Sequence, residues 1–251
     1  MNNILISAHK NYRFPNSELY TPIHVGKKNS SYHIDTIGDD TEINISHKNS
    51  TFCELTALYW AWKNNFFAGS DFCGLVHYRR YFSGSGEQLK GKRILAEEET
   101  LKYLEEFDIL MPKKRRYYIE TVASHYANAH YQKDMLMTRK IIAQQESDYL
   151  YAFDEFMQHR SLYLFNMFIM SQEHFNAYME WLFPLLFAVE DSIDLEDYDN
   201  HQKRVFGYIS ERLFNVWLLK NKLRIKEIGV HNLEGENFFL KAWGLIKRKF
   251  V

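Results

Sequence analysis

The chain has 251 residues, of which 46% are hydrophobic and 25% charged, a composition that excludes an intrinsically disordered protein. Its formal net charge of −1 excludes a global positive field, so no nucleic-acid partner is expected. Two cysteines are too few for a zinc site or a disulfide framework. The length is sufficient for one large α/β domain with a substantial core.

Strands and helices are predicted to alternate through the first half of the chain. The apolar run at residues 4–8 predicts a buried strand, and the polar residues His9 and Lys10 follow its end. Ligands of open α/β sheets bind at the carboxyl ends of the strands, so these two residues are candidate ligand contacts. The other elements predicted in this half are an extended segment at 22–26, a turn at 38–40, a helix at 51–64 capped by Asn49 or Ser50, a strand at 72–78, a helix at 97–107 and a strand at 108–111.

Helices dominate the second half. The predicted elements are two or three helices within 119–158, a strand at 163–170, long helices at 172–191 and 201–221, and a last strand at 223–230. This order predicts an α/β fold in which helices flank a mixed sheet and gather in the C-terminal half. No internal repeat and no linker rich in Pro, Gly or Ser interrupts the sequence, so residues 1–237 are predicted to form one domain.

Residues 238–251 form a basic amphipathic tail that contains Trp243. Such a tail is typical of a helix on a membrane surface, and docking on its own domain is an equal alternative. The N-terminus lacks the layout of a signal peptide, and the longest apolar run, 181–189, is too short to span a bilayer. A cytoplasmic protein is therefore expected, in peripheral contact with the inner face of the plasma membrane if the tail binds lipid.

The densest chemical signal is the segment 74–82, where a hydrophobic strand is followed by His77, Tyr78, Arg79 and Arg80. Arginine pairs bind phosphate in a bidentate manner, and their charge could stabilise a departing nucleoside diphosphate without a metal. A surface arginine pair with a structural histidine is the alternative. Successive residues of a strand point to opposite faces, so both arginines reach one ligand only if the strand has already ended.

Several blocks together resemble an uncharacterised family of bacterial capsular and exopolysaccharide gene clusters, a domain of unknown function with a His-Tyr-Arg-Arg-Tyr-Phe motif that is usually assigned as a glycosyltransferase. The blocks lie at residues 7–10, 22–26, 38–46, 53–64, 77–82, 165–170 and 206–213. The resemblance implies a nucleotide-binding part at about 1–112 and a sugar and acceptor part at about 113–237.

The layout is also similar to that of glycosyltransferases with a single Rossmann-like domain, the GT-A fold. In that fold a strand ends in an Asp-x-Asp motif that holds a divalent metal on the donor diphosphate, and a later apolar strand with an Asn shapes the sugar site. Residues 165–170 resemble the later strand, but His77 to Arg80 stand where Asp-x-Asp is expected. A literal Asp197-Tyr198-Asp199 lies in an acidic stretch that is predicted to be a solvated loop. Metal-independent catalysis without a cofactor is therefore the hypothesis.

The candidate site residues fall into three groups, and for most of them a cap, a turn or an ion pair is the alternative role. The candidate catalytic residues are Glu211, as the base that deprotonates the acceptor, with His77, Arg79 and Arg80. The candidate donor-binding residues are Ala8, His9, Lys10, His24, Val25, Gly26, Asp39, Asn44, Ser46, Asn49 and Tyr78. The candidate sugar and acceptor contacts are Asn166 and Arg204 and also His125, His130 and Asp134, which share one helical face if their helix is continuous.

The function implied by the resemblance is transfer of a hexose from a UDP-sugar donor, with galactose in pyranose or furanose form as the suggested sugar. The acceptor implied is a growing polysaccharide carried on a polyprenyl diphosphate lipid. The alternative is a non-catalytic module that binds nucleotide sugar or carbohydrate and scaffolds a capsule assembly complex. A nucleotidyltransferase is disfavoured because no Gly-rich phosphate loop occurs.

Overall fold

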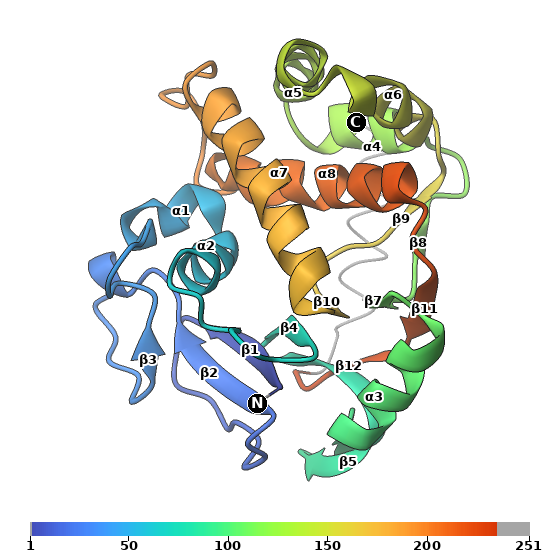
Figure 1. Cartoon of the computed structure of the whole chain (residues 1–251). Helices are drawn as coiled ribbons and strands as arrows, with labels where there is room; N and C mark the ends of the chain where they lie inside the picture. Colours follow the sequence, from blue (N-terminus) through green and yellow to red (C-terminus); the bar gives the residue numbers. More distant parts are fainter. Residues whose placement is uncertain (1, 235–251) are drawn as a thin grey trace.

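Ten strands form a mixed sheet at the centre of the computed structural model, which describes residues 2–234 (Figure 1). Seven of them follow the order β11-β7-β10-β4-β1-β2-β3, while β5 pairs with β4, β6 and β12. The strands are β1 (Asn3–Ala8), β2 (Tyr20–His24), β3 (Ile37–Gly38), β4 (Cys73–His77), β5 (Arg80–Leu89), β6 (Lys92–Ile94), β7 (Ile109–Pro112), β10 (Phe168–Met170), β11 (Ile225–Ile228) and β12 (Val230–Asn232). The predicted α/β class with a mixed sheet is confirmed.

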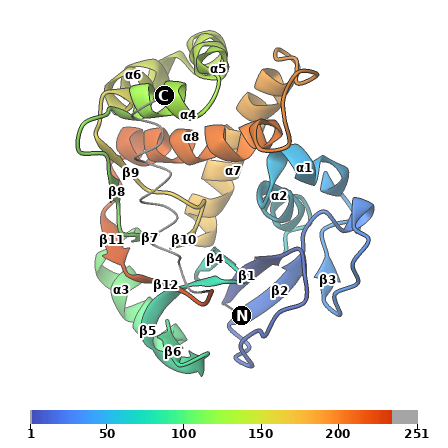
Figure 2. The same cartoon turned by 180° about the vertical axis from the view of Figure 1, so that it is seen from behind.

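Helices cover the sheet and gather beyond residue 113 of the described chain, as predicted. Figure 2 shows α1 and α2 beside β1 and β2, with α4, α5 and α6 at the far end of the molecule. The helices are α1 (Asn49–Phe52), α2 (Leu55–Lys63), α3 (Glu97–Glu106), α4 (Val122–Ala129), α5 (Gln132–Gln145), α6 (Leu150–Met157), α7 (Gln172–Glu190) and α8 (Val205–Asn221). A short pair, β8 (Arg115–Arg116) and β9 (Ser161–Leu162), lies outside the main sheet.

The side chains of β1 alternate between two buried faces of the sheet, which explains why its sequence is continuously apolar. Leu5 packs in the larger core cluster with the helices, whereas Ile4 and Ile6 pack in a second cluster with β5 and β6. All three side chains are fully buried, because both faces of this strand are covered. Strand β1 pairs in parallel with both β2 and β4, so their carboxyl ends meet at one edge of the sheet.

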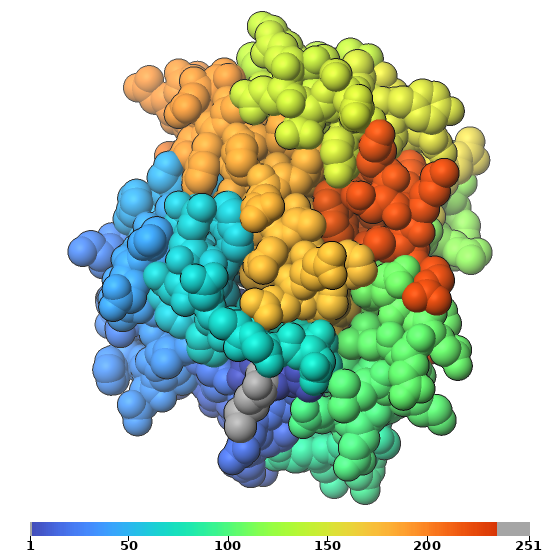
Figure 3. Space-filling model, in the orientation of Figure 1, coloured from blue at the N-terminus to red at the C-terminus, as the bar shows by residue number. Residues whose placement is uncertain are grey.

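Aromatic side chains fill much of the larger core. The rings of Tyr59 and Trp62 on α2 contact the ring of Phe183 on α7, with the Trp62 ring stacked at 5.8 Å. The Tyr178 ring of α7 stacks on Phe214 of α8 at 4.4 Å. Figure 3 shows α2 and α7 side by side on the front face. The high aromatic content thus serves packing in large part.

Three predicted elements were wrong in extent. The helix expected at 51–64 is broken at Cys53, where φ is 53°, and Asn49 donates from its side chain to the Cys53 carbonyl at 2.6 Å. The strand expected at 163–170 is confined to β10, because Phe165 and Asn166 have positive φ values. The strand expected at 223–230 is divided into β11 and β12. In addition, β5 was not predicted from the sequence.

The predicted basic tail at 238–251 lies outside the described residues. Within residues 2–234, the helices are too short or too polar for any of them to cross a bilayer.

Candidate functional site

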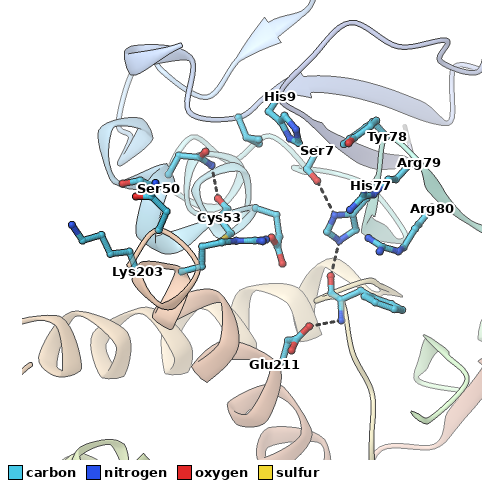
Figure 4. A pocket seen from close by; sticks show the side chains of 16 residues that line it. Ser7, His9, Ser50, Cys53, His77, Tyr78, Arg79, Arg80, Lys203 and Glu211 are labelled. Atoms are coloured by element: carbon cyan, nitrogen blue, oxygen red, sulfur yellow. Dashed lines mark hydrogen bonds between the residues drawn. The ribbon is translucent and has the colours of Figure 1, made fainter. Parts of the chain in front are cut away.

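A cavity of about 600 Å³ opens at the carboxyl ends of β1 and β4 (Figure 4). Its opposite wall is formed by α1, by the segment just before α8 and by Glu211 of α8. This position is where ligands of open α/β sheets bind. The cavity is lined by Ser7, His9, Val25, Asn49, Ser50, Cys53, Glu54, His77, Tyr78, Arg79, Arg80, Phe165, Asn200, Lys203, Arg204 and Glu211.

Strand pairing brings Ser7 and His77 together. They are register partners at the ends of β1 and β4, and the Ser7 Oγ lies 3.5 Å from the His77 Nδ1. The other ring nitrogen, Nε2, lies 2.6 Å from the Phe165 carbonyl oxygen, which can only accept, so Nε2 carries a proton. Burial lowers the pKa of His77, and the nearby Arg80 and Arg79 lower it further. A neutral His77 therefore accepts at Nδ1 from the Ser7 hydroxyl and holds the Phe165 loop in place.

The loop at Phe165 and Asn166 connects several walls of the cavity. Both residues have positive φ, 79° and 50°, which costs on the order of 1 kcal/mol or more for each non-glycine residue. The Phe165 N–H donates to the Glu211 Oε1 at 2.8 Å, and the Asn166 amide donates to the Glu54 Oε1 at 2.8 Å. These bonds hold the loop in an unfavourable backbone conformation that forms part of the cavity wall.

Arg79 lies in the turn between β4 and β5, and Arg80 is the first residue of β5. Strand β4 ends at His77, and the pairing of His77 with Arg80 starts β5. Because β4 has ended before Arg79, strand alternation does not direct the two arginines to opposite faces. Arg79 and Arg80 therefore both line the cavity. The Arg80 guanidinium lies 4.5 Å from the centre of the Phe165 ring.

One carboxylate neutralises part of this positive charge. Glu234 binds the Arg79 guanidinium at 3.1 Å and the Lys10 ammonium at 3.2 Å. These two cations hold the pKa of Glu234 below its ordinary value. An anionic group is thus already bound by Arg79 in this structure, next to the cavity.

Glu211 presents a carboxylate from α8, with 16% of its side chain exposed. It accepts from the Phe165 N–H and forms an ion pair with Arg212 at 3.0 Å. Burial raises the pKa of Glu211, although Arg212 and the Phe165 N–H oppose this shift. A carboxylate with a raised pKa is a stronger base than an exposed one, which suits the removal of a proton from a hydroxyl group.

Cys53 and Arg204 form a second contact across the cavity. The Arg204 Nε donates to the Cys53 Sγ at 3.3 Å. Burial raises the pKa of Cys53 to about 12, so the thiol stays neutral. Arg204 therefore keeps its full charge at the cavity wall.

The structure brings nine of the predicted site residues into this one cavity, and their chemical roles stay predictions. They are His9, Val25, Asn49, His77, Tyr78, Arg79, Arg80, Arg204 and Glu211. Asn166 lies beside it through its bond to Glu54. The lining residues that the sequence did not assign to the site are Ser7, Ser50, Cys53, Glu54, Phe165, Asn200 and Lys203. A sequence signal existed for Ser7, the polar residue just before the end of the first strand. Asn200 and Lys203 lie in the segment before α8, and only tertiary packing brings them to the cavity.

Seven predicted donor-binding residues do not line the cavity. Ala8 and His24 are fully buried. A Cβ on Gly26 would lie 2.5 Å from the Asn49 Oδ1, so this glycine permits close packing against α1. The others are Lys10, Asp39, Asn44 and Ser46.

Asp39 is an internal anchor of the fold. Its fully buried carboxylate accepts from the N–H groups of Gly26 at 2.8 Å and Lys27 at 3.1 Å. It also accepts from the hydroxyls of Ser46 at 2.5 Å and Thr56 at 2.6 Å. These four bonds occupy its oxygens, so the predicted ribose contact finds no support in this geometry.

Replacing Asp39 with Asn should lower the free energy of unfolding by about 2–4 kcal/mol, because buried donors lose a charged acceptor. Chemical denaturation measures this change. The matched control is Asp40→Asn, because Asp40 is half-buried and forms an ion pair with Lys27 at 3.4 Å. The control should lose less than about 1 kcal/mol. Equal losses for the two variants would contradict the anchor role.

His125, His130 and Asp134 do not share one helical face, so that prediction was wrong. Helix α4 ends at Ala129 and α5 begins at Gln132, because the chain leaves the helical conformation at His130. None of the three lines the cavity. Their hydrogen-bond partners are Glu120 for His125, Gln202 for His130, and the hydroxyls of Tyr126 and Tyr198 for Asp134.

The literal Asp-x-Asp does not fit a metal site on the cavity. Asp197 and Asp199 are exposed, and Asp199 accepts from the N–H groups of His201 and Gln202 just before α8. Tyr198 between them is buried. Within residues 2–234, no three His, Cys, Asp or Glu side chains are grouped so that they could hold a metal ion.

A family model described as "Domain of unknown function (DUF4422)" matches residues 3–222. The solved apo structure of WbbM, a bifunctional glycosyltransferase, is similar to this chain with a TM-score of 0.84 and 34% sequence identity. The similarity covers 94% of this chain and 46% of that one, so this chain spans less than half of the length of WbbM. No curated protein matches this chain.

Proposed function

The chain belongs to the family described as Domain of unknown function (DUF4422), and we propose that it is a glycosyltransferase that uses a nucleotide-sugar donor. The observation that carries the proposal is the convergence of Arg79, Arg80 and Arg204 with the partly buried carboxylate of Glu211 around one cavity. Cations suit the diphosphate of a donor, and such a carboxylate suits the deprotonation of an acceptor. The similarity to WbbM supports the same reaction class.

In the proposed step the arginines and Glu211 have separate roles. The bond between the anomeric carbon and the diphosphate oxygen breaks, and its electron pair stays on the departing nucleoside diphosphate. Arg79 and Arg80 stabilise the charge that develops there. The acceptor hydroxyl forms the new bond to the anomeric carbon, and its proton passes to Glu211. His77 orients the Phe165 loop, which in turn positions Glu211.

We propose a UDP-hexose as the donor, with galactose or galactofuranose as the sugar. The proposed acceptor is a growing capsular or exopolysaccharide chain on a polyprenyl diphosphate lipid, at the cytoplasmic face of the membrane. These choices rest on the sequence blocks that include residues 77–82 and 206–213.

We also propose that the cations replace a metal on the donor diphosphate, since the Asp-x-Asp segment does not line the cavity. The deciding experiment is incubation with a panel of UDP-sugars and detection of released UDP, with EDTA or with added manganese. Release in EDTA supports the proposal. If EDTA abolishes activity and manganese restores it, metal independence is wrong. Binding of UDP without turnover of any donor would instead favour the nucleotide-sugar-binding scaffold.

Replacing Glu234 with Gln should tighten UDP binding about fivefold, because the Arg79 guanidinium at the cavity no longer holds an internal carboxylate in a partly exposed ion pair. Calorimetric titration with UDP measures the change. Glu105→Gln, at an exposed position of α3, is the charge-matched control. The gain should vanish in an Arg79→Ala background. A gain that persists there would show that Glu234 acts elsewhere.

A further inference from the structure

Residues 113–119 form an exposed segment that the proposed reaction does not use, here called the basic strip. Its first four residues are the exposed cations Lys113, Lys114, Arg115 and Arg116. They are followed by Tyr117, which is buried, and then by the side chains of Tyr118 and Ile119, which are 86% and 75% exposed. Neither the strip nor the neighbouring strand β9 contributes to the cavity.

The backbone of the strip is held in place. Arg115 and Arg116 form β8, which pairs antiparallel with β9. The Tyr117 N–H donates to the Arg160 carbonyl at 2.7 Å, and the Tyr117 ring stacks on His125 at 3.8 Å. Because Tyr117 anchors the segment from inside, the cations before it and the Tyr118–Ile119 pair after it are displayed on a fixed surface.

The positive charge of the strip is not neutralised by the described protein. Across residues 2–234, no acidic side chain forms an ion pair with any of its four cations. Two of them rest on aromatic rings: the Lys114 Nζ is 4.9 Å from the Tyr163 ring centre, and the Arg115 guanidinium is 5.7 Å from that of Tyr117. Such contacts leave the charged groups exposed to an external anion.

We propose that the basic strip docks the protein on an anionic phospholipid surface. Clustered Lys and Arg attract such a surface, and a tyrosine beside them is a residue preferred at the membrane interface. Ile119 favours the lipid surface, because an aliphatic side chain gains from the acyl boundary of a lipid and makes no hydrogen bond to the phosphates or base edges of a nucleic acid. The proposal needs no catalysis, so it stands or falls separately from the glycosyltransferase function.

Figures 1 and 2 place β8 on the side of the molecule opposite to β3 and α1. Helix α1 contributes Asn49 and Ser50 to the cavity wall. Lipid bound at the strip would therefore leave that wall of the cavity uncovered, so that docking and ligand binding are compatible.

The test is co-sedimentation of the 251-residue chain with vesicles of phosphatidylcholine alone or mixed equally with phosphatidylglycerol. The chain should bind only the anionic vesicles, and added salt should weaken this binding. Lys113→Ala/Arg116→Ala should reduce the partition coefficient on the order of 20-fold, since each cation near such a surface contributes about 1 kcal/mol. Tyr118→Ser/Ile119→Ser, with unchanged charge, should reduce it by about tenfold.

The charge-matched control is Lys92→Ala/Lys102→Ala, which removes two exposed lysines of β6 and α3 and should leave vesicle binding intact. Thermal unfolding of each variant excludes loss of fold as the cause. Unchanged vesicle binding by both strip variants would overturn the proposal, as would an equal loss in the control. Loss of binding to a single-stranded RNA with vesicle binding intact would assign the strip to nucleic acid and would also overturn it.

Discussion

Replacing Glu211 with Gln is expected to lower kcat by about 10²- to 10⁴-fold, the usual contribution of a general base. The amide keeps an oxygen that can accept from the Phe165 N–H, so the loop should stay in position. What it loses is the ability to take a proton from the acceptor hydroxyl. The measurement is UDP release under saturating donor and acceptor, with the dissociation constant of UDP determined in parallel.

The pH profile separates this role from a structural one. The base must be ionised, so kcat should fall as the pH drops through the pKa of Glu211. Because burial raises that pKa, the acidic limb should lie above the range of an ordinary glutamate. The residual activity of the Gln variant should lack this limb. A variant that loses UDP affinity and kcat together, with the limb unchanged, would contradict the assignment of Glu211 as the base.

Replacing Arg79 or Arg80 with Ala should lower kcat/KM by about 10²- to 10³-fold, the range found when one preorganised donor to a developing negative charge is removed. The free energy of unfolding should change by less than about 1 kcal/mol, because neither side chain is fully buried and surface ion pairs contribute little. Steady-state kinetics and chemical denaturation measure the two effects.

Lysine substitutions at the same positions refine this prediction. Arg79→Lys and Arg80→Lys keep the charge but lose the planar bidentate geometry, so they should recover only part of the activity. Arg93→Ala is the control, because Arg93 is exposed on β6, lies outside the cavity and donates to carbonyls of β5. If the alanine variants at positions 79 and 80 turn over donor as the control does, the cations do not act on the leaving group.

The order of the helices and strands could be predicted because their hydrophobic patterns in the sequence are strong. The apolar run of β1 and the amphipathic pattern of α3 each matched the structure closely, since burial on two faces or on one face imposes its period directly on the sequence. The failures cluster around the cavity. The positive φ values at Cys53, Phe165 and Asn166 interrupt a predicted helix and a predicted strand, and of these three residues only the asparagine is of a type that favours positive φ. They are stabilised by distant partners such as His77, Glu211 and Glu54.

The same distinction separates the site residues. His77, Arg79 and Arg80 were found because strand β4 ends directly before a run of charged and polar residues. The role of Asp39 could not be inferred, because the local sequence of a turn does not show whether its carboxylate binds a ligand or, as here, four internal donors. Likewise, one continuous helix would place His125, His130 and Asp134 on the same face, but the chain leaves the helical conformation at His130.

By itself the amino-acid sequence determined the α/β class, the sequence order of most strands and helices, and the cationic end of β4, because side-chain polarity follows the period of each element. Only the tertiary structure decided that Glu54, Asn200 and Lys203 line the cavity at this end, while Asp39 and Asp134 turn into the interior. Such choices depend on contacts between residues far apart in the chain, where the hydrogen-bond partners and the burial of a side chain are set by packing rather than by its neighbours in sequence.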